Sequence, residues 1–403
     1  MDSKGTHQGD EVNGGDKGPV YINPIDILEE IDLNDEDLPD ANESQDEDDE
    51  VQDSVIAMEE VDDSIHTFIG HHGPIFSVAC HPIDPSLVAT GGADDIAYLW
   101  RAGDGLIYHE LRGHTDSVTS LEFSADGLLL ASGGCDGVVN VWDSASGDLK
   151  HKLEGPFRSI EWLQWHPKGH LILAGSYDFT SWLWNADVGL CLKVFTGHCG
   201  AVTCGGFTPD GKLICTGSED GSLRVWSPKA SESIHVVKGQ HFHSELLTCL
   251  SIADDSNLAI TGSLDAKSCL VNIGTGKVVG SLWSHSDSIQ CVGFLHGHHL
   301  VASGALDGKL IIWDLQSLSI RNTCQHEDGV LQFVWSPTSQ VIYSGCSDGK
   351  VRLWDPRTGN CECIFQGHVD KIQSLAISST GKFVLSGSDD HTARIFETYR
   401  AFG

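Results

Sequence analysis

A motif of about 42 residues recurs eight times between residue 70 and the C-terminus, and a period of this length constrains the architecture more than any single residue does. The second copy, GHTDSVTSLEFSADGLLLASGGCDGVVNVWD from Gly113 to Asp143, shows the pattern. A small polar loop is followed by three short runs rich in apolar and β-branched residues, separated by turn signals such as Ala-Asp-Gly and Cys-Asp-Gly. Each copy is therefore expected to form successive antiparallel strands.

The copies align on one Asp, which is followed six residues later by a Trp in six of the eight copies. The aligned residues are Asp94, Asp136, Asp178, Asp220, Asp265, Asp307, Asp348 and Asp390. The residues six positions later are Trp100, Trp142, Trp184, Trp226, Val271, Trp313, Trp354 and Phe396. The copies span about 70–100, 113–142, 155–184, 197–226, 242–271, 284–313, 325–354 and 367–396.

A loop His and a strand hydroxyl accompany the Asp in seven copies, as His114, Ser132, Asp136 and Trp142 do in the second. The third copy lacks both, because Pro156 and Ala174 stand in their places. Joint loss is expected of one hydrogen-bond network, since a half-satisfied buried polar group costs more than an apolar substitute. We interpret His, hydroxyl, Asp and Trp as a structural tetrad and not as a hydrolytic triad, which an enzyme needs only once.

These motifs are the signature of WD40 repeats, and the chain resembles that class. The resemblance implies an all-β fold, a propeller of eight blades. Only seven residues follow Phe396, too few for the outer strand of the last blade. We expect the segment from Ser64 to Ile69 to supply that strand and close the ring, which removes an open sheet edge.

Charge divides the chain into an acidic leader, residues 1–63, and the propeller, residues 64–403. Residues 1–66 carry 23 Asp and Glu against two Lys, a net charge of −21. So many charges with few aromatic residues predict a disordered tail. The stretch from Pro24 to Ile31 leaves two readings open, a short amphipathic helix with apolar residues at 25, 28 and 31, or an ordinary solvated tail.

The composition also limits the classes of function. The remaining chain is acidic as well, with 35 acids against 22 Lys and Arg, so both parts would repel nucleic acid and favour basic protein partners. Thirteen Cys without zinc-type spacing indicate a reducing compartment. The sequence has no apolar run long enough to predict membrane insertion. It also has no phosphate loop and no nucleophile elbow, motifs that would predict an enzyme or a cofactor. We expect a monomer in the cytoplasm, with passage into the nucleus left open.

One face of a propeller carries the loop His and the residue before the aligned Asp, around the mouth of the central channel. On this upper face we expect apolar anchors and acids, a combination suited to a peptide that carries Arg or Lys. The candidate partner-binding residues are Phe76, Glu161, Tyr177, Glu219, Leu264, Leu306, Leu331 and Asp389.

Within the WD40 class, the acidic leader and the eight repeats resemble the family of the angio-associated migratory cell protein. The resemblance extends through Ile234-His235-Val236-Val237-Lys238-Gly239 and Thr275-Gly276-Lys277-Val278-Val279-Gly280, and includes the irregular fifth copy. That family also contains a fungal ribosome-assembly propeller, whose acidic upper face captures the basic N-terminal segment of a large-subunit ribosomal protein. The resemblance implies the same chaperone role here, with the acids and aromatics above as the contact residues.

Two alternatives remain open from the sequence. Trp354, Asp355 and Arg357 resemble the box with which some WD40 proteins dock the adaptor of a cullin-type ubiquitin ligase, although Trp-Asp-x-Arg also arises readily from the repeat pattern. A general signalling scaffold is the other alternative, and it predicts several unrelated partners.

Overall fold

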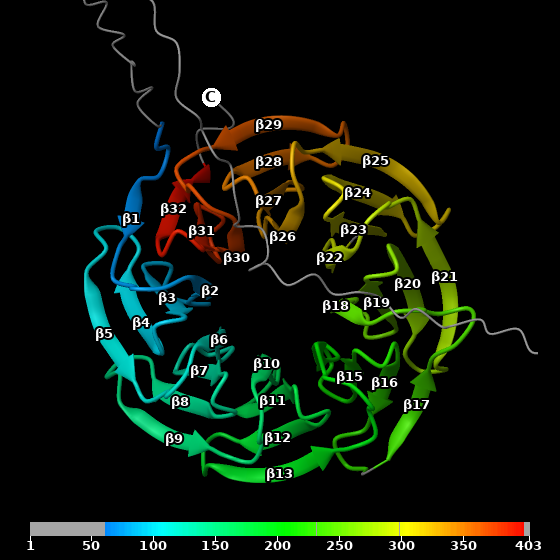
Figure 1. Cartoon of the computed structure of the whole chain (residues 1–403), viewed down its shortest axis with the longest axis horizontal. Helices are drawn as coiled ribbons and strands as arrows, with labels where there is room; N and C mark the ends of the chain where they lie inside the picture. The colour runs from blue at the N-terminus through cyan, green and yellow to red at the C-terminus, as the bar shows by residue number, and fades with distance from the viewer. Residues whose placement is uncertain (1–60, 231, 298, 399–403) are drawn as a thin grey trace, which may run out of the picture. The chain divides into compact units, whose positions relative to one another are not determined.

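The described part of the chain is a ring of eight four-stranded antiparallel sheets (Figure 1). The computed structural model describes residues 61–398 except 231 and 298, so the predicted disordered tail, apart from its last residues 61–63, lies outside the described residues. These residues belong to one compact unit, Glu59–Gly403. The predicted all-β, eight-bladed propeller is confirmed. Over the described ranges, no helix is long and apolar enough to cross a membrane.

Each blade comprises four strands, and the innermost strand lines the central channel: it is the first strand in the chain in blades 1 to 7 and β30 (Ile372–Ile377) in blade 8. Blade 1 consists of β2 (Ile75–Cys80), β3 (Leu87–Gly92), β4 (Ile96–Arg101) and β5 (Ile107–Arg112), and blade 2 of β6 (Val118–Phe123), β7 (Leu129–Gly134), β8 (Val139–Asp143) and β9 (Leu149–Leu153). Blade 3 consists of β10 (Ile160–Trp165), β11 (Leu171–Ser176), β12 (Ser181–Asn185) and β13 (Leu190–Phe195), and blade 4 of β14 (Cys204–Phe207), β15 (Ile214–Gly217), β16 (Leu223–Trp226) and β17 (Ser233–Val237).

The second half of the ring repeats this order. Blade 5 consists of β18 (Leu247–Ile252), β19 (Leu258–Ser263), β20 (Lys267–Asn272) and β21 (Lys277–Trp283), and blade 6 of β22 (Ile289–Phe294), β23 (Leu300–Ala305), β24 (Lys309–Asp314) and β25 (Ser319–Gln325). Blade 7 consists of β26 (Val330–Trp335), β27 (Ile342–Cys346), β28 (Val351–Asp355) and β29 (Asn360–Phe365), and blade 8 of β30 (Ile372–Ile377), β31 (Phe383–Ser388), β32 (Ala393–Glu397) and β1 (His66–Phe68). Copy five is thus a full blade, with Val271 fully buried where most other copies have Trp.

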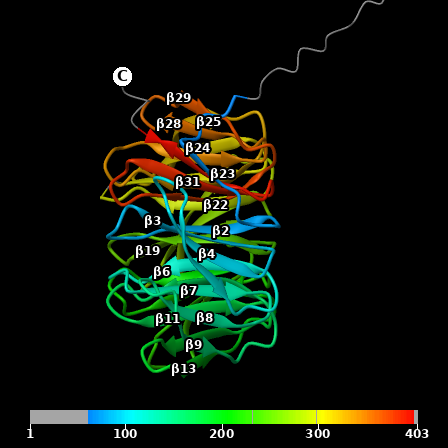
Figure 2. The same ribbon diagram turned by 90° about the vertical axis from the view of Figure 1, so that its left-hand side faces the viewer.

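The N-terminal strand closes the ring, as predicted. His66 of β1 pairs with Ile395 of β32, and Phe68 pairs with Ala393. Figure 1 shows β1 beside β32, and Figure 2 views this side of the ring edge-on. Phe68 also stacks on Trp100 of blade 1, with ring centroids 4.7 Å apart and an interplanar angle of 9°. β1 therefore joins the last blade to the first through a sheet edge and an aromatic stack.

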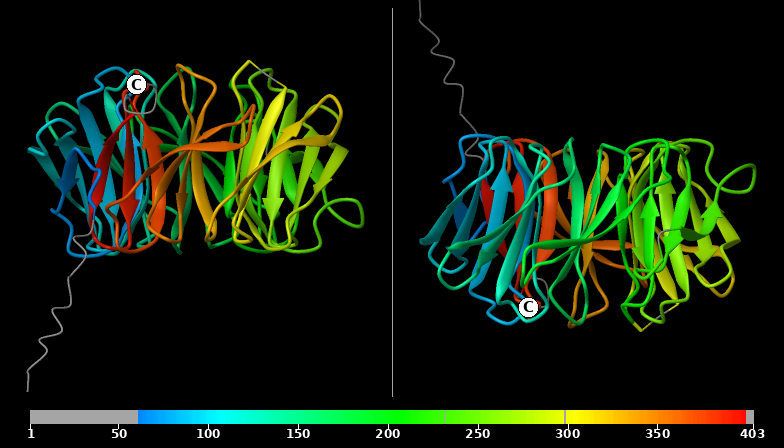
Figure 3. Two further views of the ribbon diagram at one scale, coloured as in Figure 1. Left: turned by 90° about the horizontal axis from the view of Figure 1, so that it is seen from above. Right: turned by 90° about the horizontal axis from the view of Figure 1, so that it is seen from below.

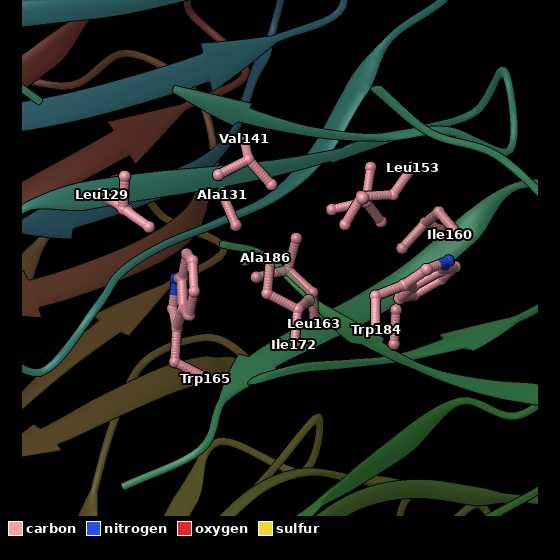
Figure 4. Close-up of a cluster of buried hydrophobic side chains, with 12 residues drawn as sticks. Leu129, Ala131, Val141, Leu153, Ile160, Leu163, Trp165, Ile172, Trp184 and Ala186 are labelled. Atoms are coloured by element: carbon pink, nitrogen blue, oxygen red, sulfur yellow. The ribbon is translucent and has the colours of Figure 1, made fainter. Parts of the chain in front are cut away.

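The hydrophobic core is divided among the junctions between neighbouring blades. Figure 4 shows one junction, where Leu129, Val141 and Leu153 of blade 2 pack against Ile160 and Trp184 of blade 3. Burial of each such side chain contributes roughly 1.5–3 kcal/mol, which stabilises the blades against one another.

The strands run between two faces that carry the loops (Figure 3). We call upper the face with the loops that enter each first strand and the turns between second and third strands. The lower face carries the turns between first and second strands and between third and fourth strands.

Candidate functional site

The predicted tetrad is a continuous hydrogen-bond chain in blade 2. The Trp142 indole N–H donates to Ser132 Oγ over 2.9 Å, and Ser132 Oγ lies 2.8 Å from His114 Nε2. His114 Nδ1 lies 3.1 Å from Asp136 Oδ1, and the Thr115 N–H donates to the same carboxylate. One proton arrangement satisfies all four groups, with His114 neutral and protonated on Nδ1. Ser132 is fully buried and already accepts a bond, so no substrate reaches this Ser-His-Asp arrangement.

The complete tetrad occurs in blades 1, 2, 4 and 6 of the described ring. Blades 5 and 8 have Val271 and Phe396 in place of Trp, so they lack the indole N–H. In blade 7, His326 Nε2 bonds Ser344, but its Nδ1 lies 3.2 Å from the Cys324 carbonyl. The tetrad Asp of this blade, Asp348, instead pairs with Arg352 at 2.5 Å. The missing indole of blades 5 and 8 was already visible in the sequence, whereas the loss of the His–Asp bond in blade 7 was not expected from the pattern.

Blade 3 corrects a second expectation. The joint absence of His and hydroxyl was expected to leave no polar group unsatisfied, yet Trp184 Nε1 is buried without a hydrogen-bond partner among the described residues. Trp182 lies beside it, with stacked rings 5.8 Å apart. Asp178 keeps its loop role and accepts a bond from the Phe157 N–H over 3.2 Å.

The tetrads shift the pKa values of their members. Burial opposes ionisation of Asp136, but the hydrogen bonds from His114 and Thr115 N–H hold its pKa below the usual range. Burial and the nearby Arg352 charge lower the pKa of His326 to about 4, so that this ring is neutral at physiological pH.

A repeated backbone bond positions the upper face. In every blade, the N–H of the residue before the aligned Asp donates to a carbonyl in the loop that enters the first strand. The pairs are Ala93 to Pro74, Cys135 to Ser117, Tyr177 to Ser159, Glu219 to Ala201, Leu264 to Leu246, Leu306 to Ser288, Ser347 to Gly329, and Asp389 to Lys371. The candidates Tyr177, Glu219, Leu264, Leu306 and Asp389 therefore have fixed backbones at the channel rim.

The other three candidates share a different local feature. Phe76, Glu161 and Leu331 each lie at a register shift near the start of the first strand of a blade. A bulge re-aims a side chain out of the regular alternation. In blades 2 and 5 the bulge residues are Thr119 and Thr248, whose hydroxyls instead donate to Ile160 and Ile289 carbonyls of the next blade. Sequence reasoning did not identify these bonds between blades.

Five of the eight candidates form two groups around the rim, an apolar one and an acidic one; Phe76, Tyr177 and Asp389 lie on blades 1, 3 and 8. Leu264, Leu306 and Leu331 lie on the consecutive blades 5, 6 and 7, and about 40% of the surface of Leu264 and Leu306 is exposed. Glu161 and Glu219 lie on the neighbouring blades 3 and 4. The upper face thus places a row of leucines beside a pair of carboxylates.

The three acidic candidates differ in their partners. Glu161 accepts a bond from the Ser159 hydroxyl over 2.6 Å, and Glu219 accepts one from the Ala201 N–H over 3.3 Å. Asp389 forms a 3.1 Å ion pair with Lys371 and accepts a bond from Gln373, so its charge is largely compensated.

Several carboxylates lie near Cys135 on the rim of blades 2 and 3. Burial raises the pKa of the Cys135 thiol, and the charges of Asp116, Glu161 and Asp136 raise it further. On blade 3, Tyr177 is half-exposed and its ring lies 5.6 Å from the Arg158 guanidinium. The loop acid Asp116 accepts a bond from its neighbour, the Ser117 N–H, and therefore also shapes the loop.

The ligase-type box has structural partners inside blade 7. The buried Trp354 donates to Ser344 over 3.0 Å. Asp355 binds Arg357 through two bonds of 3.0 and 2.9 Å, while the Arg357 side chain stays 64% exposed. No contact among the described residues favours adaptor docking over this structural role. The described ranges also contain no group of three His, Cys, Asp or Glu that could hold a metal ion.

Seven segments of the chain match the WD domain, G-beta repeat family: residues 62–101, 105–143, 147–185, 189–227, 276–314, 318–355 and 359–397. The gap between 227 and 276 contains three strands of blade 5 and its Val271. The human angio-associated migratory cell protein is 38% identical over 363 residues, which are 86% of this chain and 83% of that protein.

Two solved structures share the fold. Chaetomium thermophilum Sqt1 bound to the N-terminus of the ribosomal protein L10 has a TM-score of 0.77 and 25% identity, and the match covers 84% of this chain and 100% of that chain. Saccharomyces cerevisiae Sqt1 has a TM-score of 0.76 and 22% identity, over 84% of this chain and 99% of that chain.

Proposed function

Because the chain belongs to the WD40-repeat family, as a homologue of the angio-associated migratory cell protein, we propose that it is a dedicated chaperone for a basic segment of a large-subunit ribosomal protein. A WD40 propeller is a protein-interaction domain, and the upper face is the part of this propeller whose chemistry suits such a client. One structural neighbour, Chaetomium thermophilum Sqt1, was crystallised with the N-terminus of the ribosomal protein L10, which supports this class of client.

The observation that carries the proposal is the pair Glu161 and Glu219. Both are at the channel rim on neighbouring blades, held by a bulge and by a backbone bond, and neither forms an ion pair with Lys or Arg within the described ranges. Two uncompensated carboxylates in fixed positions suit the guanidinium and ammonium groups of a basic segment.

The leucine row defines the rest of the client. Leu264, Leu306 and Leu331 would contact apolar side chains of the segment, while its basic side chains reach blades 3 and 4. Exposed apolar side chains promote aggregation and basic ones bind nucleic acid non-specifically, so a chaperone that covers both would protect such a client.

The test is affinity capture of the tagged full chain with mass spectrometry, beside the variant Glu161→Lys with Glu219→Lys. One large-subunit ribosomal protein should dominate the wild-type capture and fall at least about tenfold in the variant, because charge reversal replaces attraction by repulsion.

The matched control reverses two exposed acids outside the upper face, Asp148→Lys with Glu362→Lys, and changes the net charge by the same amount. This control should retain the client. Absence of any enriched ribosomal protein in the wild-type capture, or equal loss in both variants, would contradict the proposal.

A further inference from the structure

A groove on the lower face, at the junction of blades 1 and 2, is separate from the upper face and has no role in the function proposed above. Its volume is about 380 Å³, within the range of ligand-binding pockets. Ile83 and Leu128, from the first lower turns of the two blades, line the groove together with Tyr108 of β5. Ile83 is 66% exposed and Leu128 is 61% exposed, so the groove presents large apolar side chains to solvent.

The other blades serve as internal comparisons for this groove. The position of Leu128 in its turn is polar in the seven other blades, as Ser86, His170, Lys212, Asn257, His299, Gln340 and Lys382. Blade 1 also has one extra residue in the equivalent turn, where the sequence is His-Pro-Ile-Asp-Pro-Ser-Leu. Between blades 5 and 6 the equivalent groove has only about 190 Å³, with His299 in place of Leu128. The repeat pattern does not require the apolar character of the blade 1 to 2 groove.

The floor of the groove is preformed. His81 Nε2 lies 2.9 Å from the Gly127 carbonyl, and His81 Nδ1 accepts the Asp84 N–H over 2.8 Å, so the ring is held at both nitrogens. Gly127 has φ of +73°, and a Cβ there would lie 2.2 Å from the His81 ring. His109 similarly lies 3.0 Å from the Ala145 carbonyl. A preformed floor lowers the entropic cost of binding a ligand.

The charge of the groove selects its ligand. Asp84 and Asp126 lie among the lining residues, which include no Lys or Arg. Arg101 lies beside the groove and donates to the Tyr108 hydroxyl, but its charge is paired with Asp104 over 2.9 Å. The Ser86 hydroxyl and N–H both donate to Asp84 Oδ1 and hold the pKa of this carboxyl below its usual range. Oδ2 of Asp84 accepts no hydrogen bond within the described ranges, so it can accept one from a ligand. Although burial opposes ionisation of Asp126, bonds from Ser124 and His170 lower its pKa to about 2.

We propose that this groove is a second protein-docking site, which binds a short peptide segment of a partner with adjacent large apolar side chains followed by Arg or Lys. The apolar side chains pack between Ile83, Leu128 and Tyr108, and the cation contacts Asp84. A propeller with such a site could hold a second protein while its upper face is occupied.

The experiment uses a phage-displayed random dodecapeptide library, selected on the immobilised full chain and then counter-selected on the full-length variant Leu128→Lys. Lys212 and Lys382 occupy the same turn position in blades 4 and 8, so the substitution fits the fold. The retained peptides should contain apolar residues beside Arg or Lys. Synthetic fluorescein-labelled copies should bind Leu128→Lys at least about tenfold more weakly in fluorescence polarisation, and Asp84→Asn should weaken them with a loss of salt dependence.

The matched control is Leu190→Lys, which adds the same charge at an equally exposed leucine on blade 3. It should not change the affinity of the peptides, and neither should the pair Glu161→Lys with Glu219→Lys. The proposal is overturned if every selected peptide still binds Leu128→Lys, or if the retained peptides are acidic. It is also overturned if the upper-face variant no longer binds the retained peptides. If a synthetic peptide of residues 21–34 displaces the selected peptides, the occupant of the groove is the acidic leader of this chain. If sedimentation shows that the full chain is a dimer and that Leu128→Lys dissociates it, the occupant of the groove is a second copy of the chain.

Discussion

Ala174 and Trp184 lie together in the core of blade 3, and Ala174 holds the position from which Ser132 accepts the Trp142 indole N–H in blade 2. The Trp184 N–H therefore has no partner among the described residues. A buried donor without an acceptor costs about 1–3 kcal/mol. Blade 3 thus carries a local energetic defect that the other Trp-containing blades avoid.

Ala174→Ser should raise thermal stability, because the new hydroxyl can accept the Trp184 N–H. The opposite substitution, Ser132→Ala, should lower the melting temperature by about 2–4 °C per kcal/mol lost, since it leaves Trp142 and His114 unsatisfied. Differential scanning fluorimetry of the two variants and the wild type checks both signs. A lower melting temperature for Ala174→Ser would show that steric or desolvation costs exceed the gain.

Ring closure gives the second prediction. A chain that begins at residue 61 should retain the wild-type melting temperature, whereas one that begins at residue 70 should lose several degrees, because it lacks β1 and the Phe68 stack on Trp100. Phe68→Ala in the full chain should have an intermediate effect, since loss of a buried Phe costs about 3–5 kcal/mol at a well-packed site. Equal melting temperatures for the two truncated chains would refute the closing role of β1.

The fold was predictable because the same pattern of strands and turns occurs eight times in the sequence. The period, the turn signals and the missing last outer strand together predicted the blades and the closing strand. Local irregularities were not predictable, because they depend on contacts between residues far apart in the motif. Arg352 displaces His326 from Asp348 in blade 7, and Lys371 pairs with Asp389 on the upper face. Neither of these two ion pairs can be predicted from the repeat pattern of the sequence.

The candidate site shows the same limit. The sequence placed the eight residues on one face, but the bulges at Phe76, Glu161 and Leu331 follow from backbone register, which the sequence does not state. The lower groove was missed altogether. Its signal was present in Leu128, the single apolar residue at a turn position that is polar in every other copy.

His326 predicts a specific pH dependence of stability. Its folded pKa of about 4 is below the ordinary value near 6.5, so between these values the unfolded chain binds one more proton than the folded chain. Stability should therefore fall as pH falls from about 7.5 to about 4, and His326→Gln should show a shallower decline over this range. The lowered pKa of Asp136 affects stability at lower pH, because its contribution to the stability of the folded chain is lost only as pH falls below about 4.

Thermal unfolding at several pH values measures this slope. His72→Gln, at an exposed histidine on the upper face, is the matched control and should follow the wild type. Parallel curves for His326→Gln and the wild type would show that His326 is not a source of the decline.

Arg357→Ala tests the ligase-type box. Arg357 is exposed and pairs only with Asp355 among the described residues, so its loss should leave the melting temperature nearly unchanged. If the chaperone proposal holds, affinity capture should recover the same proteins as the wild type. Selective loss of ubiquitin-ligase adaptor proteins from the capture would instead favour the alternative function.

Lys371→Ala should strengthen binding of a basic client segment. Lys371 neutralises Asp389 of blade 8 across 3.1 Å, and its removal leaves a third carboxylate without an ion pair on the upper face, in addition to Glu161 and Glu219 of blades 3 and 4. For the same reason, Asp389→Asn should weaken binding less than Glu161→Gln, because Asp389 is already occupied. Isothermal titration with a synthetic peptide of the captured ribosomal protein, at low and high salt, measures the three affinities. The gain from Lys371→Ala should shrink at high salt, because screening weakens exposed charges most. If Lys371→Ala leaves the affinity unchanged, the client does not use Asp389, and the charged part of its interface is confined to blades 3 and 4.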